Sequence, residues 1–143
     1  MLTAQALATC LLMASNTYQV PAAVMIGIMH VEGGHVGQEA GPNINGTYDL
    51  GPMQVNTRWV QKLAYYTGLP PYVVFWRLRD DGCFNIAVAG AIMRTYLDEA
   101  HGNLMLAIGD YHSHTPVLNQ AYQAMVLHSA VDLFATSAAA RQR

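Results

Sequence analysis

The chain has 143 residues, of which 52% are hydrophobic and only 11% are charged, and its formal net charge is −2 at pH 7. This length suits a single domain, 1–143, that is large enough to bury a core. The basic residues are few and scattered, which argues against a nucleic-acid-binding protein. No apolar stretch reaches the roughly 18 to 20 residues that a membrane-spanning helix needs.

The first segment, LTAQALATCLLMA, could be a targeting sequence or a helix of the mature protein. A signal peptide would carry basic residues ahead of its apolar core, and none is present here. Leu7, Leu11 and Ala14 recur at helical spacing. The sequence therefore favours an amphipathic helix over about 3–17. It shows no export signal, and it is silent on any leader ahead of residue 1.

The remaining pattern is mostly helical. Pro21 opens a second helix and Gly33 ends it. Between 34 and 55 the helical periodicity disappears, and the turn signal Asn45-Gly46 predicts an irregular or hairpin lobe, a long loop of the kind that tends to be functional. Further helices are expected over about 56–68, 70–78, 81–102, 104–111 and 116–133, and the tail, about 136–143, is expected to fray. This predicts a mainly α fold, of the α+β kind, with six or seven helices.

Glu32 stands at the end of the second predicted helix, directly before two glycines. The helix macrodipole places negative potential there, and partial burial also disfavours the charged form, so we expect the pKa of Glu32 to be raised. A carboxylic acid that stays protonated near neutral pH is what a general acid requires. The alternative, which position alone slightly favours, is a helix-end glutamate that points into water.

Two later segments add polar groups that suit a carbohydrate. The segment DLGPMQVN places Gln54 and Asn56 near Met53. Amide side chains that both donate and accept hydrogen bonds suit sugar hydroxyl and N-acetyl groups, although Asn56 could instead cap a helix. The segment DYHSH offers the hydroxyl group of Tyr111 to a buried carboxyl group, with His112 beside it.

The chain carries a glutamate near a helix end, then DLGPMQVN, and then DYHSH. This ordered set resembles the signatures of lytic transglycosylases with a goose-type lysozyme-like fold. The likeness spans about residues 10–122. It is strongest to the small enzymes associated with type IV secretion and conjugation, in which one cysteine precedes the glutamate, as Cys10 does, and another opens a segment like CFNIAVAG, as Cys83 does. The two residues alone leave free thiols and a disulfide equally open. The resemblance implies that they pair.

The resemblance implies a lysozyme-like helical bundle whose small lobe flanks a cleft, and an enzyme that cleaves the MurNAc–GlcNAc β-1,4 bond of peptidoglycan. Glu32 would protonate the leaving oxygen and then, once ionised, remove the proton of the C6 hydroxyl group to give 1,6-anhydroMurNAc. No cofactor and no metal are expected. The implied substrate contacts are Met53, Gln54, Asn56, Tyr111 and His112.

The implied setting is the periplasm or bacterial cell envelope. There a monomer would bind glycan strands and open the wall for secretion, conjugation or pilus components.

Four positions depart from the pattern of those enzymes. Gly33 stands where they have serine, Pro52 where they have leucine, Asp110 where they have alanine and His112 where they have asparagine. The serine supplies a hydrogen bond that orients the glutamate. Its replacement by Gly33 therefore keeps open a weakened activity, a specialised substrate, or a non-catalytic peptidoglycan-binding scaffold.

Two further alternatives involve other ionisable residues. Asp49 could act as a second carboxylate in a hydrolytic, inverting lysozyme, but the interpretation that we favour is that it pins the loop through backbone hydrogen bonds. A zinc enzyme is disfavoured, because the spacing is not the His-Glu-x-x-His order that places two imidazoles on one helix face. The residues that it would draw on are His30, Glu32, His35, His112 and His114.

Overall fold

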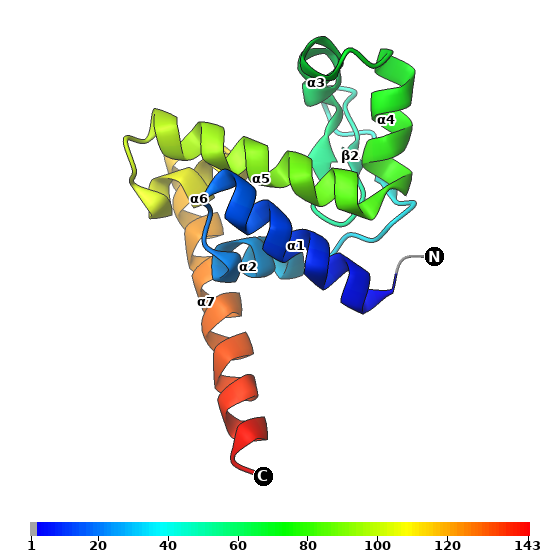
Figure 1. Ribbon diagram of the computed structural model, residues 1–143. Coiled ribbons are helices and arrows are strands. Elements are labelled where there is room, and N and C mark those ends of the chain that lie inside the picture. The colour runs from blue at the N-terminus through cyan, green and yellow to red at the C-terminus, as the bar shows by residue number, and fades with distance from the viewer. Residues whose placement is uncertain (1–2) are drawn as a thin grey trace. The chain divides into compact units, whose positions relative to one another are not determined.

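The fold is mainly α-helical with one small antiparallel sheet, as Figure 1 shows for the computed structural model, which describes residues 3–143. This confirms the predicted α+β class. The elements are α1 (Ala4–Tyr18), α2 (Ala22–Glu32), β1 (Glu39–Ala40), β2 (Asp49–Leu50), β3 (Val55–Asn56), the 3-10 helix η1 (Thr57–Trp59), α3 (Val60–Thr67), α4 (Pro71–Asp80), α5 (Gly82–Glu99), α6 (Leu104–His112) and α7 (Pro116–Arg141).

Local sequence signals set several of the helix ends. Asn103 caps α6, and its side chain accepts a hydrogen bond from the Leu106 amide at 3.1 Å. Pro71 and Pro116 stand at the first positions of α4 and α7, where the missing N–H would have no helical partner. Gly68 ends α3 with φ 70°, a left-handed conformation that glycine adopts without steric cost.

The C-terminal tail differs from its prediction. We expected residues 136–143 to fray, but α7 continues through Arg141. Residues 138–140 are all alanine, the residue type with the highest intrinsic helix propensity. The hydroxyl groups of Thr136 and Ser137 donate to carbonyl oxygens one turn earlier, at 2.9 and 3.0 Å, and so do not compete for the helix amides.

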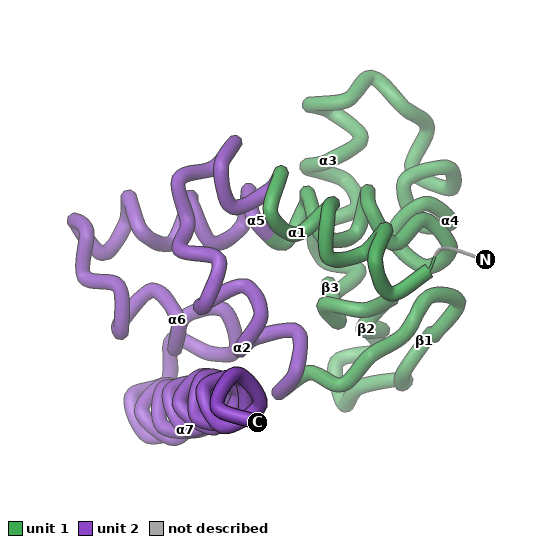
Figure 2. The backbone as a smooth tube through the Cα atoms, turned by 60° about the horizontal axis from the view of Figure 1, so that its bottom comes forward, with its two compact units in different colours: residues 1–13, 32–89 green, residues 14–31, 90–143 purple. Residues whose placement is uncertain are grey.

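The chain divides into two compact units, each built from two separate stretches of sequence (Figure 2). The first unit comprises residues 1–13 and 32–89, and the second comprises residues 14–31 and 90–143. The assignment of the whole chain to one domain stays a prediction.

A disulfide joins Cys10 of α1 to Cys83 at the start of α5, within the first unit. Their Cα atoms lie 5.3 Å apart, a separation typical of a disulfide. The predicted pairing is therefore confirmed. Disulfides form and persist in oxidising compartments, and this one indicates that the chain folds in such an environment.

The segment between 34 and 55 forms the predicted small lobe around a sheet of order β1-β2-β3 with antiparallel pairing. At the Asn45-Gly46 turn, the Asn45 side chain accepts hydrogen bonds from the amide and hydroxyl groups of Thr47, at 3.1 and 2.6 Å. This local bonding is why an asparagine stabilises the turn. Beneath the lobe lie six side chains that are almost fully buried: Leu50, Met53, Val55, Val74, Leu78 and Ile86.

Within the second unit, small residues allow helices to approach one another closely. A Cβ atom built on Gly27 of α2 would lie 3.2 Å from the Val126 carbonyl oxygen of α7. A Cβ atom on Gly109 of α6 would collide with the side chain of Asn119. The core of this unit includes Val20, Met25, Ile28, Ile92, Met93, Tyr96, Ile108, Tyr122 and Val126.

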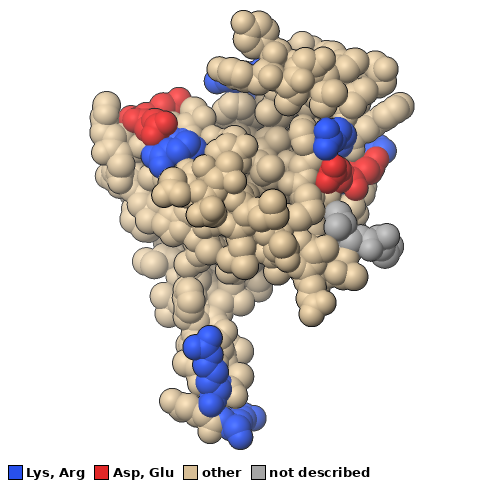
Figure 3. Space-filling view, in the orientation of Figure 1, with Lys and Arg blue, Asp and Glu red and all other residues tan. Residues whose placement is uncertain are grey.

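Charged side chains are sparse on the surface that Figure 3 shows, and some of them adjoin side chains of opposite sign. Arg79 bonds Asp80 at 2.8 Å and contacts Glu39 at 3.5 Å. The hydrogen bonds from the Arg79 guanidinium lower the pKa of the Asp80 carboxyl group. In the described part of the chain, no helix is both long enough and apolar enough to cross a bilayer.

Candidate active site

Glu32 is the last residue of α2, and its side chain is half-buried. Gly33 follows with φ 62°, so the backbone leaves the helix immediately after the carboxylate. The residue therefore sits at the C-terminal end of the helix, where the macrodipole presents negative potential. The structure places Glu32 where the sequence predicted, and its role as an acid stays a prediction.

The turn after Glu32 packs directly on the segment that carries Gln54. A Cβ atom on Gly34 would lie 2.7 Å from Gln54 Nε2 and 3.1 Å from Gln54 Cγ, and it would also collide with the Gly51 carbonyl oxygen. Only glycine fits at this contact. The fold thus packs the Gln54 side chain against Gly34, which follows the predicted acid by two positions.

Gln54 has an unusual backbone conformation for a residue with a side chain. Its φ is 49°, in the left-handed region, where a residue other than glycine is strained by about 1 to 2 kcal/mol. Its backbone amide and its Nε2 both donate to the Gly51 carbonyl oxygen, at 3.1 and 2.9 Å. Strain that the surroundings impose at one polar residue is common at functional sites.

Asn56 serves mainly as a structural hub of the lobe. Its Oδ1 accepts from the Arg58 amide at 2.9 Å and caps η1. Its Nδ2 donates to Thr47 Oγ1 and to Asp49 Oδ1, each at 2.9 Å. Both amide hydrogens are therefore used inside the protein. The capping role holds in the structure, and the sugar contact stays a prediction that would have to use the remaining lone pair of Oδ1.

Asp49 is tied into the same lobe through both carboxylate oxygens. Oδ1 accepts from Asn56 Nδ2 at 2.9 Å, and Oδ2 accepts from Asn43 Nδ2 at 3.0 Å. The side chain thus holds the loop together, as the favoured interpretation of this residue expected, although through side-chain amides. The role of Asp49 as a second carboxylate that activates water stays a prediction.

Met53 differs from its expected role as a substrate contact. The residue has no exposed surface, and its side chain fills the core beneath the lobe. Its backbone amide donates to Asn85 Oδ1 at 2.9 Å. The sequence placed Met53 on a binding surface because Gln54 follows it. Its side chain is apolar and flexible, and such side chains commonly fill gaps in a core.

Tyr111 and His112 belong to the second unit, at the C-terminal end of α6. Tyr111 is half-buried, and the exposed His112 ring stacks on Tyr122 with a centroid distance of 5.0 Å. Asp110 is buried and accepts a hydrogen bond from Asn119 Nδ2 at 2.8 Å, so this departure from the enzyme pattern is structural. The approach of Tyr111 to Glu32 and the substrate contact of His112 stay predictions.

Among residues 3–143, no group of three or more His, Cys, Asp or Glu side chains is arranged to hold a metal ion. His114 Nε2 lies 3.8 Å from both Glu99 and Asp110, too far for hydrogen bonds.

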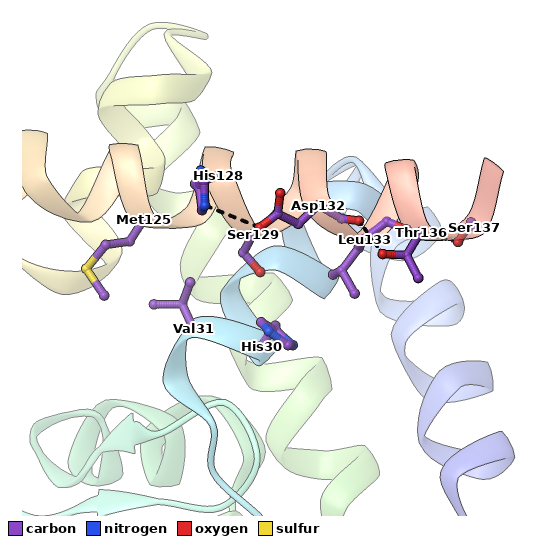
Figure 4. A pocket seen from close by; sticks show the side chains of 9 residues that line it. All are labelled: His30, Val31, Met125, His128, Ser129, Asp132, Leu133, Thr136 and Ser137. Carbon is purple, nitrogen blue, oxygen red and sulfur yellow. Dashed lines mark hydrogen bonds and ion pairs between the residues drawn. The ribbon is translucent and has the colours of Figure 1, made fainter. Parts of the chain in front are cut away.

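A groove of about 590 Å³ lies within the second unit, between the end of α2 and one face of α7 (Figure 4). His128 Nε2 contacts Asp132 Oδ2 at 3.2 Å along its rim. Ser129 Oγ is buried without a hydrogen-bond partner. None of the side chains predicted to act on or bind a substrate lines this groove. The residues that line it are His30, Val31, Met125, His128, Ser129, Asp132, Leu133, Thr136 and Ser137.

Sequence reasoning missed Asn85, a fully buried asparagine on α5. Its Nδ2 donates to the carbonyl oxygens of Leu50 and Leu78, at 2.7 and 2.8 Å. A signal was present, because a single amide interrupts the apolar stripe of this helix, and a buried polar group must find hydrogen-bond partners.

Gly51 is the residue whose substitution should test this contact. Its φ is 68°, and a Cβ atom would lie 2.5 Å from both Asn85 Nδ2 and the Leu78 carbonyl oxygen. We expect Gly51→Ala to lower the free energy of unfolding by about 2 to 4 kcal/mol, because conformational strain and overpacking add. Gly37→Ala is the control, since φ is 89° there but no atom lies within 4 Å. Urea denaturation should show a loss of only about 1 kcal/mol for it; equal losses would contradict the packing argument.

No model of a known protein family matches the chain, and no curated protein matches it.

Proposed function

We propose that this chain is a peptidoglycan lytic transglycosylase that cleaves the MurNAc–GlcNAc β-1,4 bond and forms 1,6-anhydroMurNAc. The observation that carries the proposal is the setting of Glu32. Glu32, a half-buried residue, ends α2, and the glycine turn that follows packs on the Gln54 side chain. The ordered segments DLGPMQVN and DYHSH and the Cys10–Cys83 disulfide support it.

One carboxyl group performs both proton transfers in this mechanism. Glu32, in its protonated form, gives its proton to the glycosidic oxygen as the bond to C1 of MurNAc breaks. The carboxylate that remains takes the proton of the C6 hydroxyl group, whose oxygen then bonds to C1. The acid is regenerated and no water is consumed. The C-terminal end of α2 favours the neutral starting form of Glu32, which this cycle requires.

The bonding of Asp49 supports a single-carboxylate mechanism over a hydrolytic one. An inverting glycosidase needs a second carboxylate that activates water. Both oxygens of Asp49 instead accept hydrogen bonds from side-chain amides of the lobe.

We expect Asp49→Asn to destabilise the lobe without changing the reaction product. Asparagine offers only one acceptor oxygen, so one bond to Asn43 or Asn56 is lost, and the free energy of unfolding should fall by about 1 to 2 kcal/mol. Asp98→Asn, which breaks an exposed pair with Arg94, is the control and should cost less than about 1 kcal/mol. Loss of all glycan cleavage by folded Asp49→Asn would favour the lysozyme mechanism.

The non-catalytic scaffold remains the second candidate because of Gly33. With φ 62° at this position, glycine suits the backbone, but the serine hydroxyl group that orients the acid in the similar enzymes is missing. Under this alternative the protein binds glycan strands without cleaving them.

The setting that we propose is the periplasm of the bacterial cell envelope, which is consistent with the disulfide. There the chain, as a monomer, would open peptidoglycan locally for a secretion, conjugation or pilus machine.

The test is mass spectrometry of the soluble products released from purified sacculi. Under our proposal the muropeptides end in anhydroMurNAc, one water lighter than hydrolytic products. Reducing ends would identify a lysozyme. Glycan binding without any released product would identify the scaffold. EDTA should leave the release unchanged.

A further inference from the structure

Asn85 connects α5 to two other backbone segments of the first unit, the turn between Leu50 and Met53 and the C-terminal part of α4. It is fully buried on α5, and its side chain makes three hydrogen bonds. Its Oδ1 accepts from the Met53 amide at 2.9 Å, and its Nδ2 donates to the carbonyl oxygens of Leu50 and Leu78 at 2.7 and 2.8 Å. Both hydrogens and one lone pair of the amide are used, so its orientation is fixed.

These bonds hold both ends of the turn that precedes Gln54. The bonded groups belong to Leu50 and Met53, the residues on either side of Gly51 and Pro52. Gly51 approaches Asn85 so closely that no side chain fits there. Gln54, the residue after Met53, is held in its left-handed conformation by hydrogen bonds back to the Gly51 carbonyl oxygen. Asn85 therefore fixes the backbone from which the Gln54 side chain projects.

The disulfide and local hydrogen bonds hold the start of α5, where Asn85 lies. It lies two residues after Cys83, whose disulfide to Cys10 anchors the start of α5. The backbone amide of Asn85 donates to the Asp81 carbonyl oxygen, and the backbone amide of Phe84 donates to Asp81 Oδ1, each at 3.0 Å. A polar side chain on an anchored helix can set the geometry of a loop more sharply than loop residues alone.

We propose that Asn85 is a positioning residue for the reaction assigned above. It holds the Leu50–Met53 backbone so that the side-chain amide of Gln54 stays beside Gly34, two residues after Glu32. From there the amide can hydrogen bond the sugar next to the acid. This inference rests on the proposed function. Small displacements of a substrate-positioning group can lower turnover by about 100-fold, so a buried residue without contact to substrate can control the rate.

A double-mutant cycle separates positioning from general stability. The release of anhydro-muropeptides is measured below the unfolding temperature for Asn85→Ala, Gln54→Ala and the double variant. We expect each single substitution to lower kcat/KM by about tenfold or more. If Asn85 acts through Gln54, the double variant should match Gln54→Ala within about twofold. Multiplied losses would overturn the proposal.

Ile86→Ala is the matched control, because Ile86 is the next residue on α5 and is also fully buried. Its substitution removes packing but no bond to the Leu50–Met53 backbone. We expect it to lower the melting temperature at least as much as Asn85→Ala, while kcat/KM of the folded protein stays within about twofold of wild type. A loss of activity equal to that of Asn85→Ala would show that Asn85 acts through stability alone.

Two measurements keep this test independent of the proposed reaction. Hydrogen exchange at the Met53 amide should accelerate in Asn85→Ala by about tenfold or more beyond any acceleration in Ile86→Ala, which loses packing but no bond to this amide. If wild type releases no product, the proposed reaction fails, and positioning of Gln54 is then judged by binding of a β-1,4-linked N-acetylglucosamine tetrasaccharide. Asn85→Ala should weaken that binding by about tenfold, and no further when Gln54→Ala is added. Unchanged binding or unchanged exchange would overturn the proposal.

Discussion

Replacing Glu32 with glutamine is expected to lower the rate of anhydro-muropeptide release by about 10²- to 10⁴-fold, the range that general acid–base catalysis contributes. Glutamine has nearly the same size and can hydrogen bond, but it has no proton to give to the glycosidic oxygen and cannot take one from the C6 hydroxyl group. Both steps of the proposed cycle therefore fail together. The measurement is the initial rate of release from sacculi, followed by mass spectrometry, for wild type and Glu32→Gln.

The same variant should bind glycan as wild type does, because the substitution removes a proton transfer and keeps the surface of the site. Glu99→Gln is the matched control, since that side chain is 56% exposed at the end of α5 and lies far along the chain from the acid. It should leave the rate unchanged. If Glu32→Gln releases products as fast as wild type, Glu32 is not the acid and the proposed mechanism is wrong.

Removing the disulfide should produce the largest loss of stability. The bond closes a loop between residues separated by 73 positions, and the chain-entropy model assigns about 4 kcal/mol to a loop of that length. We expect the double variant Cys10→Ser/Cys83→Ser to lose about that much free energy of unfolding, as measured by urea denaturation. Because the bond holds α1 to the start of α5, the Asn85 contacts to the lobe should weaken as well.

Reduction of the wild-type protein provides the control for this experiment. Dithiothreitol should shift the wild-type urea midpoint down to near that of the double variant and should leave the double variant unmoved. An Ellman assay on the unreduced, denatured protein should find no free thiol among residues 3–143, because Cys10 and Cys83 are paired. Two thiols in that assay would contradict the pairing.

The sequence by itself determined the features that depend on neighbours along the chain. Pro71 and Pro116 mark helix starts and Gly68 marks a helix end, because fixed or left-handed φ angles are local properties. The Asn45-Gly46 turn marks the lobe through bonds that span two residues. Glu32 could be placed at a helix end for the same reason.

The cysteines show where local reasoning stopped. The residues alone left free thiols and a disulfide equally open, because pairing depends on the approach of two helices that are far apart in sequence. Only the ordered likeness to known enzymes pointed to the bond. The tail shows a smaller limit, since composition suggested fraying where the alanine run sustains α7 through Arg141.

Only the tertiary structure decided which polar side chains form hydrogen bonds within the fold. Asn56 and Asp49 bond each other across the sheet, Met53 turns into the core, and Asn85 reaches the lobe from a helix more than thirty positions away. A hydrogen bond or a buried surface joins atoms that are close in space, and the sequence records closeness only along the chain. Folding therefore uses several polar groups of the lobe in hydrogen bonds within the protein, and it places Gln54 next to the turn that follows Glu32.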